Sequence, residues 1–178
     1  MIVYSFVVPG NPNPNSSPTA TAIDGVLIQD LSWYSDQRGS LSVLLRSDQH
    51  ELVGEEFGQI YVTTVRPGVV KAWHRHEHQV DRMVGLCGQT LLVLMDGRDG
   101  SPTYGSVVEQ VLGERHHRLV LIPPGVWHGL KCLGEGESMV LNSPTRPYRF
   151  EDPDEERAAP HASPTPGLPC YDWRRVDG

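Results

Sequence analysis

Short runs of β-branched and aliphatic residues alternate with turn-forming residues along most of the chain. The runs span residues 26–28, 41–45, 59–65, 90–95, 119–122 and 139–141. Turn-forming segments separate them at residues 36–39, 66–68, 96–100 and 123–125. Many short strands at intervals of roughly 8–12 residues are typical of a β-sandwich or barrel. The pattern therefore predicts an all-β domain.

Two proline-rich segments flank this β-rich region. They are residues 9–20 (PGNPNPNSSPTA) and residues 158–169 (AAPHASPTPGLP), and such compositions are typical of irregular arms. We therefore divide the chain into three parts. These are an N-terminal arm of residues 1–24, a barrel domain of residues 25–150, and a C-terminal segment of residues 151–178 that packs on the barrel.

One short peripheral helix is predicted, at residues 152–159. Pro153 suits the first turn of a helix, and several acidic residues follow it. We interpret the charged run at residues 151–157 as the solvated start of this helix and not as an acid–base pair.

Composition narrows the class of protein. With 18 Gly and 15 Pro among 178 residues, the composition argues against a helical bundle, because both residue types destabilise helix interiors. The formal net charge of -7 argues against binding to a nucleic acid polymer. It still permits a local basic pocket for one phosphorylated small molecule.

The cysteines and the apolar segments indicate in which cellular compartment the protein is located. The 3 cysteines are odd in number and widely spaced, which favours a reducing environment over a disulfide scaffold. The first residues lack the pattern of a signal peptide, and no apolar stretch approaches the 18 or so residues of a membrane span. We expect a cytoplasmic protein.

Imidazole side chains gather in residues 68–88 (GVVKAWHRHEHQVDRMVGLCG). His74 and His76 are two residues apart, so on a strand their side chains share one face. Farther along, a Pro-Pro-Gly turn precedes His128 and delivers a further imidazole to the start of another strand.

These two segments resemble the paired motifs of the cupin fold. The first motif is a glycine, a His-x-His pair, an acidic residue and a second glycine, here Gly68, His74, His76, Asp81 and Gly88. The second motif, P-x-G-x-x-H, is formed by Pro123, Gly125 and His128. The resemblance implies a jelly-roll barrel in which the histidines converge from adjacent strands.

Two chemistries fit these side chains. His74, His76, Asp81 and His128 could together bind one divalent transition metal such as Fe, Mn, Ni or Zn. Alternatively, a neutral histidine could abstract a proton next to a carbonyl group. The remaining histidines are expected to be solvated surface residues: His50, His78, His116, His117 and His161.

Trp73 and Trp127 directly precede the motif histidines, so on strands they face away from the cavity. Packing in the core or in a dimer is favoured for them over stacking on a base. Asp96 and Arg98 lie in a glycine-rich turn, where they either cap the turn or contact a ligand.

Five segments occur in the order found in one cupin family. They are DQRG at 36–39, FGQ at 57–59, KAWH at 71–74, DGRDGSPTYG at 96–105 and IPPGVWHG at 122–129. Over about residues 25–175 the chain resembles the dTDP-4-dehydrorhamnose 3,5-epimerase family of sugar-nucleotide cupins. The resemblance implies a homodimer that exchanges N-terminal strands and binds a dTDP-4-keto-6-deoxy sugar without any cofactor.

The resemblance also implies roles for single residues. In the family, a His–Asp pair removes the proton next to the ketone, a lysine stabilises the enolate oxygen, and a tyrosine protonates the other face. The catalytic residues expected here are His74 as the base, His128 as the histidine of the second motif, and Asp172 as a nearby carboxylate. The expected substrate-binding residues are Arg38, Gln59, Lys71, His76 and Asn142.

Three departures from the family concern the chemistry. The segment that carries the family's aspartate is replaced near residues 161–163. The position of the family's lysine falls on Asp81, and that of its tyrosine falls on Asn142. The only lysines of the chain, Lys71 and Lys131, stand elsewhere. A carboxylate at position 81 repels an enolate, but it also supplies the acidic ligand of a metal site.

We therefore expect a divergent sugar-nucleotide epimerase or isomerase whose partner is a small-molecule nucleotide sugar, with no nucleic acid polymer and no membrane involved. The preferred hypothesis has no cofactor. Two alternatives stay open: a cupin that depends on one divalent transition metal, and a cupin that binds a ligand without catalysis.

Overall fold

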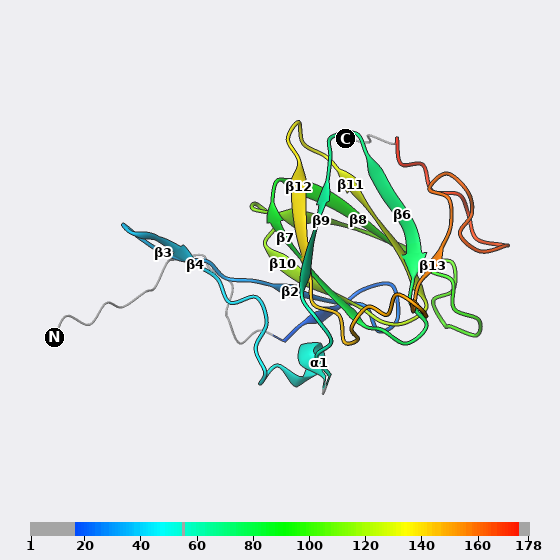
Figure 1. Ribbon diagram of the computed structural model, residues 1–178, viewed down its shortest axis with the longest axis horizontal. Coiled ribbons are helices and arrows are strands. Elements are labelled where there is room, and N and C mark those ends of the chain that lie inside the picture. The colour runs from blue at the N-terminus through cyan, green and yellow to red at the C-terminus, as the bar shows by residue number, and fades with distance from the viewer. Residues whose placement is uncertain (1–16, 55, 175–178) are drawn as a thin grey trace.

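The protein is a β-barrel made of two facing antiparallel sheets (Figure 1). The computed structural model describes residues 17–54 and 56–174. One sheet has the strand order β1 (Thr19–Ala20), β2 (Leu27–Asp30), β10 (Arg118–Ile122), β7 (Asp81–Cys87), β12 (Ser138–Asn142) and β5 (Tyr61–Val65). The other has the order β13 (Glu156–Arg157), β6 (Val70–Arg75), β11 (Val126–Cys132), β8 (Gln89–Asp96) and β9 (Val107–Gly113). The all-β prediction is confirmed.

The strand β8 shows how the barrel is packed. Leu92 and Leu94 belong to the cluster between the two sheets, whereas Val93 and Met95 face the opposite side and belong to a second cluster. All four side chains are fully buried. Because both faces of β8 are covered, its sequence is continuously apolar instead of alternating.

The second cluster lies under the C-terminal segment. Trp73 and Trp127 pack there against Leu168 and Trp173. The Trp127 indole donates a hydrogen bond to the Thr165 hydroxyl at 2.8 Å. The two tryptophans thus face away from the barrel interior and serve packing, as the alternation of side chains on strands predicts.

The helix predicted at residues 152–159 is wrong, because this segment is extended and Glu156–Arg157 forms β13 against β6. The Asp154 carboxylate explains the difference. It accepts hydrogen bonds from the backbone N–H groups of Glu77, His78 and Gln79, so it caps a neighbouring loop instead of a helix. The short helix of the structure is α1 (His50–Val53), which the sequence did not indicate.

A two-stranded hairpin, β3 (Tyr34–Asp36) and β4 (Gly39–Leu41), projects from the barrel (Figure 1). The strand predicted at residues 41–45 is wrong beyond Leu41, since residues 42–45 form no strand. Leu41 and Val43 are largely exposed. No helix in residues 17–54 or 56–174 is long and apolar enough to cross a membrane.

Part of the predicted N-terminal arm belongs to the barrel. β1 falls inside the range predicted as an N-terminal arm, and it pairs with β2 at the edge of the six-stranded sheet. Residues 1–16 of that arm lie outside the described residues.

Candidate active site

A cavity of about 1660 Å³ opens between the two sheets at one end of the barrel. This is larger than the roughly 300–1,000 Å³ typical of small-molecule pockets, and it offers room for a nucleotide-linked sugar. Its walls come from β5 and the residues before it, from the end of β6 and the loop after it, from residues 124–125, and from residues 145–149 and 152–157. The lining includes Gln59, Tyr61, His74 and His76.

The pairing of β6 with β11 brings two motif histidines together. His74 and His128 are direct partners across these strands, and their rings lie 3.9 Å apart, centroid to centroid. The strand register shifts just after His128. A Cβ atom on Gly129 would lie 2.3 Å from the Cβ atom of Ala72, so only glycine allows this close approach of the two strands.

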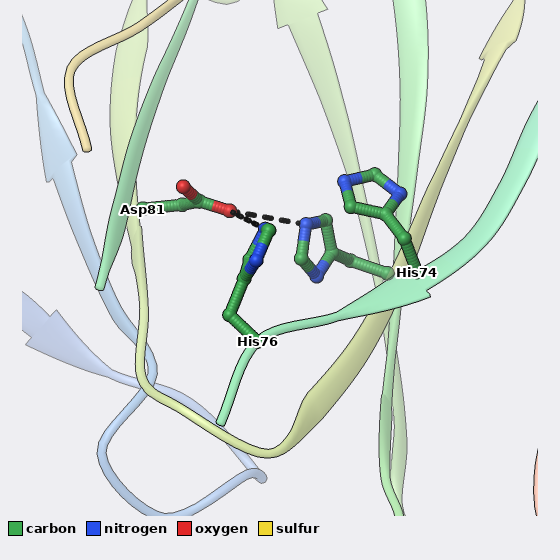
Figure 2. A group of neighbouring side chains, drawn as sticks. His74, His76 and Asp81 are labelled. Atoms are coloured by element: carbon green, nitrogen blue, oxygen red, sulfur yellow. Dashed lines mark ion pairs between the residues drawn. The ribbon is translucent and has the colours of Figure 1, made fainter. Parts of the chain in front are cut away.

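Asp81 reaches the histidines from the opposite sheet, at the start of β7 (Figure 2). Its Oδ2 atom lies 3.3 Å from Nε2 of His76 and 3.2 Å from Nε2 of His128. The side chains of Asp81 and His128 are each only 1% exposed. The sequence motifs thus converge as expected, with one ligand atom each from His74, His76, Asp81 and His128 within 4.8 Å of one another.

Backbone carbonyl groups fix the orientation of two of these imidazoles. Nδ1 of His128 donates a hydrogen bond to the carbonyl of Val126 at 3.0 Å, and Nδ1 of His76 donates to the carbonyl of Asp154. Each ring therefore carries its proton on Nδ1 when neutral, and turns Nε2 toward Asp81. Among the described residues, the two Nε2 atoms and Oδ2 of Asp81 have no polar partner other than these contacts with one another.

Charge and burial shift the acidity of this cluster. Burial raises the pKa of Asp81, but the facing His128 and His76 rings outweigh it and hold the pKa well below its usual range. Burial lowers the pKa of His76, but Asp81 outweighs burial and leaves the pKa raised. The pKa of His74 is well below its ordinary value, because of burial and of the neighbouring His128 ring. His74 is therefore neutral near pH 7 and able to accept a proton.

The other oxygen of Asp81 is held by amide groups. Oδ1 accepts hydrogen bonds from Gln79 and from the Asn142 amide nitrogen, both at 2.8 Å. The same nitrogen of Asn142 donates to the hydroxyl oxygen of Tyr61 at 3.0 Å. Since this contact uses the oxygen of Tyr61, the phenolic proton remains available to the cavity. Burial, followed by the charge of Asp81, raises the pKa of Tyr61.

Tyr61 was not recognised from the sequence. The usable signal was the alternation along β5, since Tyr61, Thr63 and Val65 lie on one face and Val65 is fully buried. Tyr61 pairs with Asn142 in the strand register, and Asn142 is itself buried. The face of β5 that carries Tyr61 therefore points into the barrel.

Several predicted site residues lie away from the cavity lining. Arg38 is in the projecting hairpin and pairs with Asp36. Lys71 is exposed and donates to the Thr63 hydroxyl at 3.1 Å. Asp172 is more than half exposed, at 56% of its side chain. Gln59, by contrast, lines the cavity, and its side-chain oxygen Oε1 accepts a hydrogen bond from the backbone N–H of Tyr148.

The glycine-rich turn after β8 has a structural role. The Asp96 carboxylate is fully buried and accepts hydrogen bonds from Arg98, Ser101 and Thr103. Burial raises its pKa, but these hydrogen bonds outweigh burial and leave the pKa well below the usual range. The alternative that Asp96 and Arg98 cap the turn therefore accounts for their contacts.

Arginine side chains supply positive charge along the cavity. Arg75 and Arg157 are neutralised by ion pairs with Glu156 and Glu155. Arg146 and Arg149 also line the cavity, and within the part of the chain that the structure describes neither forms an ion pair. These two guanidinium groups are available to an anionic ligand.

Comparison with known proteins supports the resemblance. The family model described as dTDP-4-dehydrorhamnose 3,5-epimerase matches residues 20–169. The chain is 42% identical, over 76% of its length and 86% of the relative's, to the probable low-salt glycan biosynthesis epimerase Agl13 of Haloferax volcanii. A dTDP sugar isomerase from Desulfovibrio desulfuricans superposes with a TM-score of 0.77 at 32% identity, covering 88% of this chain and 95% of that one.

A further solved structure carries a ligand. It is the dTDP-6-deoxy-D-glucose-3,5-epimerase RmlC of Legionella pneumophila in complex with dTDP-4-keto-L-rhamnose. The two proteins share 26% identity and superpose with a TM-score of 0.71, covering 79% of this chain and 76% of the other.

Proposed function

Because the chain belongs to the dTDP-4-dehydrorhamnose 3,5-epimerase family, we propose that it inverts a carbon next to the ketone of a dTDP-linked 4-keto-6-deoxy sugar. The Legionella relative solved with dTDP-4-keto-L-rhamnose supports this class of substrate. The observation that carries the proposal is the cavity, which has a proton acceptor on one sheet and a proton donor on the other.

The proton acceptor is His74, on β6. It lines the cavity and stands where the family resemblance expects the base. The carbon–hydrogen bond next to a ketone breaks when a neutral imidazole takes the proton and the electron pair moves onto the ketone oxygen. Inversion then requires that a proton returns from the opposite side of the sugar ring.

The proton donor is Tyr61, on β5 in the facing sheet. It lines the same cavity as His74, and its hydroxyl lies against Asn142, where the resemblance expects a tyrosine. Its raised pKa keeps the phenol protonated near neutral pH. A tyrosine hydroxyl is thus supplied to the barrel interior from the neighbouring strand.

The nucleotide lies toward the mouth of the cavity. Arg146 and Arg149 are positioned to bind the diphosphate, because their charges are not neutralised by carboxylates in the described part of the chain. Phe57 and Tyr148 are exposed aromatic side chains in the same lining, and aromatic rings stack on nucleotide bases. Gln59 also lines this cavity.

The predicted partner of His74, Asp172, receives no role in this proposal. It is exposed and its carboxylate pairs with Arg174. The carboxylate of the histidine cluster is instead Asp81, which contacts His76 and His128.

A homodimer accounts for the projecting hairpin. Leu41 and Val43 are exposed apolar side chains on or beside β4, and a second copy of the chain would cover them. Arg38 lies in the turn between β3 and β4, and it is not among the residues that line the cavity. We therefore assign its predicted contact with the nucleotide to the cavity of the partner subunit.

The cytoplasm is the compartment we propose. All three cysteines are free, and both Cys87 and Cys170 are exposed. Exposed free thiols are compatible with a reducing environment and unfavourable in an oxidising one.

The proposal is tested by incubating the purified protein with dTDP-4-keto-6-deoxyglucose in D2O. We expect solvent deuterium to enter the sugar next to the ketone, detected by mass spectrometry and located by NMR. Calorimetry with dTDP alone should show binding. Binding of dTDP without deuterium exchange would favour a ligand-binding cupin, and the absence of both would refute the proposal.

A further inference from the structure

The site has an excess of negative charge where the proposed reaction needs positive charge. When a proton leaves the carbon next to a ketone, charge develops on the ketone oxygen, and a cation nearby stabilises it. The resemblance expects a lysine at position 81, but this chain has a buried carboxylate there. Lys71 is bound to Thr63 outside the cavity lining and does not replace it.

The arrangement of His76, His128 and Asp81 indicates what replaces the lysine. Since the Nδ1 atoms of His76 and His128 both donate to backbone carbonyls, a neutral ring presents a lone pair at Nε2. Both lone pairs point at the same oxygen of Asp81, at 3.3 and 3.2 Å. Three buried atoms thus converge, and among the described residues their polar contacts are with one another. Such an arrangement requires positive charge among these atoms, which either a proton on an imidazole or a metal ion can supply.

We propose that Nε2 of His76, Nε2 of His128 and Oδ2 of Asp81 bind one divalent first-row transition-metal ion. Two imidazoles and one carboxylate are a ligand set that suits Mn, Fe, Co, Ni or Zn. The outer contacts also match those of metal sites, in which a ligating imidazole donates its other N–H to a carbonyl group. The other oxygen of Asp81, Oδ1, does not face the imidazoles in these ion pairs and is held in place by hydrogen bonds from Gln79 and Asn142.

His74 differs from the three ligands. Within residues 17–54 and 56–174 it makes no hydrogen bond, so no carbonyl group fixes its ring as it does in His76 and His128. It lines the cavity, and one of its nitrogens lies within 4.8 Å of the ligand atoms. We therefore keep His74 as the proton acceptor beside the metal ion.

The catalytic use of the ion rests on the proposed function. A bound divalent ion supplies the positive charge that polarises the ketone oxygen, which the family's lysine supplies in its relatives. In this chain Asp81 therefore acts by binding the ion, and its negative charge is neutralised by it.

The first test is metal content. The full-length protein, purified without chelators or added metal, should contain about one equivalent of a transition metal by elemental analysis. After removal of the metal, Co²⁺ added alone should produce the visible absorption bands of a protein-bound cobalt ion. Less than about a tenth of an equivalent, with no such bands, would overturn the proposal and show that protonated imidazoles neutralise Asp81.

Variants locate the site. Asp81→Asn and His128→Asn should each weaken Co²⁺ binding at least about 100-fold, because each removes one of three ligands. His116→Gln, which alters an exposed histidine without a motif, should bind Co²⁺ as the wild-type protein does. Circular dichroism establishes which variants are folded. Unchanged Co²⁺ binding in a folded Asp81→Asn variant would overturn the proposal.

The substitution Asp81→Lys separates the two proposals. It restores the residue that the family resemblance expects, so the variant should bind no metal and should exchange deuterium without one. Metal binding by the wild-type protein without deuterium exchange would support the metal site and refute the proposed reaction. Exchange that persists in metal-free wild-type protein would support the reaction and refute the role of the ion.

Discussion

Tyr61 and Asn142 face each other across β5 and β12, and the Asn142 amide nitrogen donates to the Tyr61 hydroxyl at 3.0 Å. The same amide nitrogen also donates to Asp81, so one side chain connects the phenol to the buried carboxylate. The phenol is thereby held at the cavity, on the sheet opposite His74.

Replacing Tyr61 by Phe should separate proton removal from inversion. We expect the rate of epimerisation to fall by about 10²–10⁴-fold, the usual contribution of a positioned general acid. Deuterium should still enter the substrate with retention of configuration, because His74 is intact. Product analysis by NMR in D2O measures both rates, and Tyr104→Phe, an exposed tyrosine, is the matched control. Unchanged epimerisation in Tyr61→Phe would exclude the phenol as the donor.

The side chains of Tyr61 and Asn142 should be exchangeable between their two positions. In the double variant Tyr61→Asn with Asn142→Tyr, the hydroxyl comes from the strand where the resemblance expects it. We expect at least about a tenfold higher rate of epimerisation than in Tyr61→Phe, since the hydroxyl returns to the cavity. A folded double variant as slow as Tyr61→Phe would show that the position of the hydroxyl is not equivalent.

Removing the imidazole of His74 should abolish proton exchange. We expect His74→Ala to lower the rate of deuterium incorporation by at least about 100-fold, because the variant lacks the proposed base. Binding of dTDP, measured by calorimetry, should change little, since the proposed nucleotide contacts lie at Arg146 and Arg149. Exchange at the wild-type rate in His74→Ala would refute its role.

The buried Asp96 carboxylate should stabilise the fold in a pH-dependent way. We expect Asp96→Asn to lower the free energy of unfolding at pH 7 by about 2–3 kcal/mol, because charge-assisted hydrogen bonds are lost. The folded-state pKa is depressed, so this stabilisation is fully present above the unfolded pKa of about 4 and is lost progressively as the pH falls from there toward the lower folded-state pKa. Urea unfolding of both proteins at pH 7 and pH 3.5 should show the difference shrinking with acid. A constant difference would contradict this account.

The exposed side chains beside β4 should hold a dimer together. Changing Leu41 and Val43 together to Asp should raise the dissociation constant at least about tenfold, since charge enters an apolar contact. Light scattering over a concentration series measures this. Leu133→Asp, an exposed apolar residue elsewhere, is the control and should leave the oligomeric state unchanged. A monomeric wild-type protein would remove the basis for placing Arg38 in the partner's cavity.

The sequence predicted the histidine cluster because its geometry is local. His74 and His76 lie on one strand, and the turn before His128 sets the start of the next, so short spacings determine their approach. Tyr61 was missed because its role depends on a partner that is distant in sequence, Asn142. The register that pairs Tyr61 with Asn142 depends on how all the strands of the sheet pair. A local sequence pattern does not determine that pairing.

The C-terminal segment was mispredicted for a related reason. The acidic residues around Pro153 fit a helix start, but Asp154 instead binds three backbone N–H groups of the loop after β6. Local propensity is weak compared with such tertiary contacts. The packing of Trp73 and Trp127 away from the cavity was predictable, because alternation along a strand is a local property.

The two-residue strand β13 occupies the outer edge of the five-stranded sheet, beside β6. Without the C-terminal segment, β6 would offer unpaired backbone groups to other chains, and the faces of Trp73 and Trp127 would be bare. Such an edge is a template for aggregation. A protein that ends at residue 150 should therefore accumulate in inclusion bodies. The C-terminal segment would then keep the protein soluble in the cell as well as form part of the cavity wall.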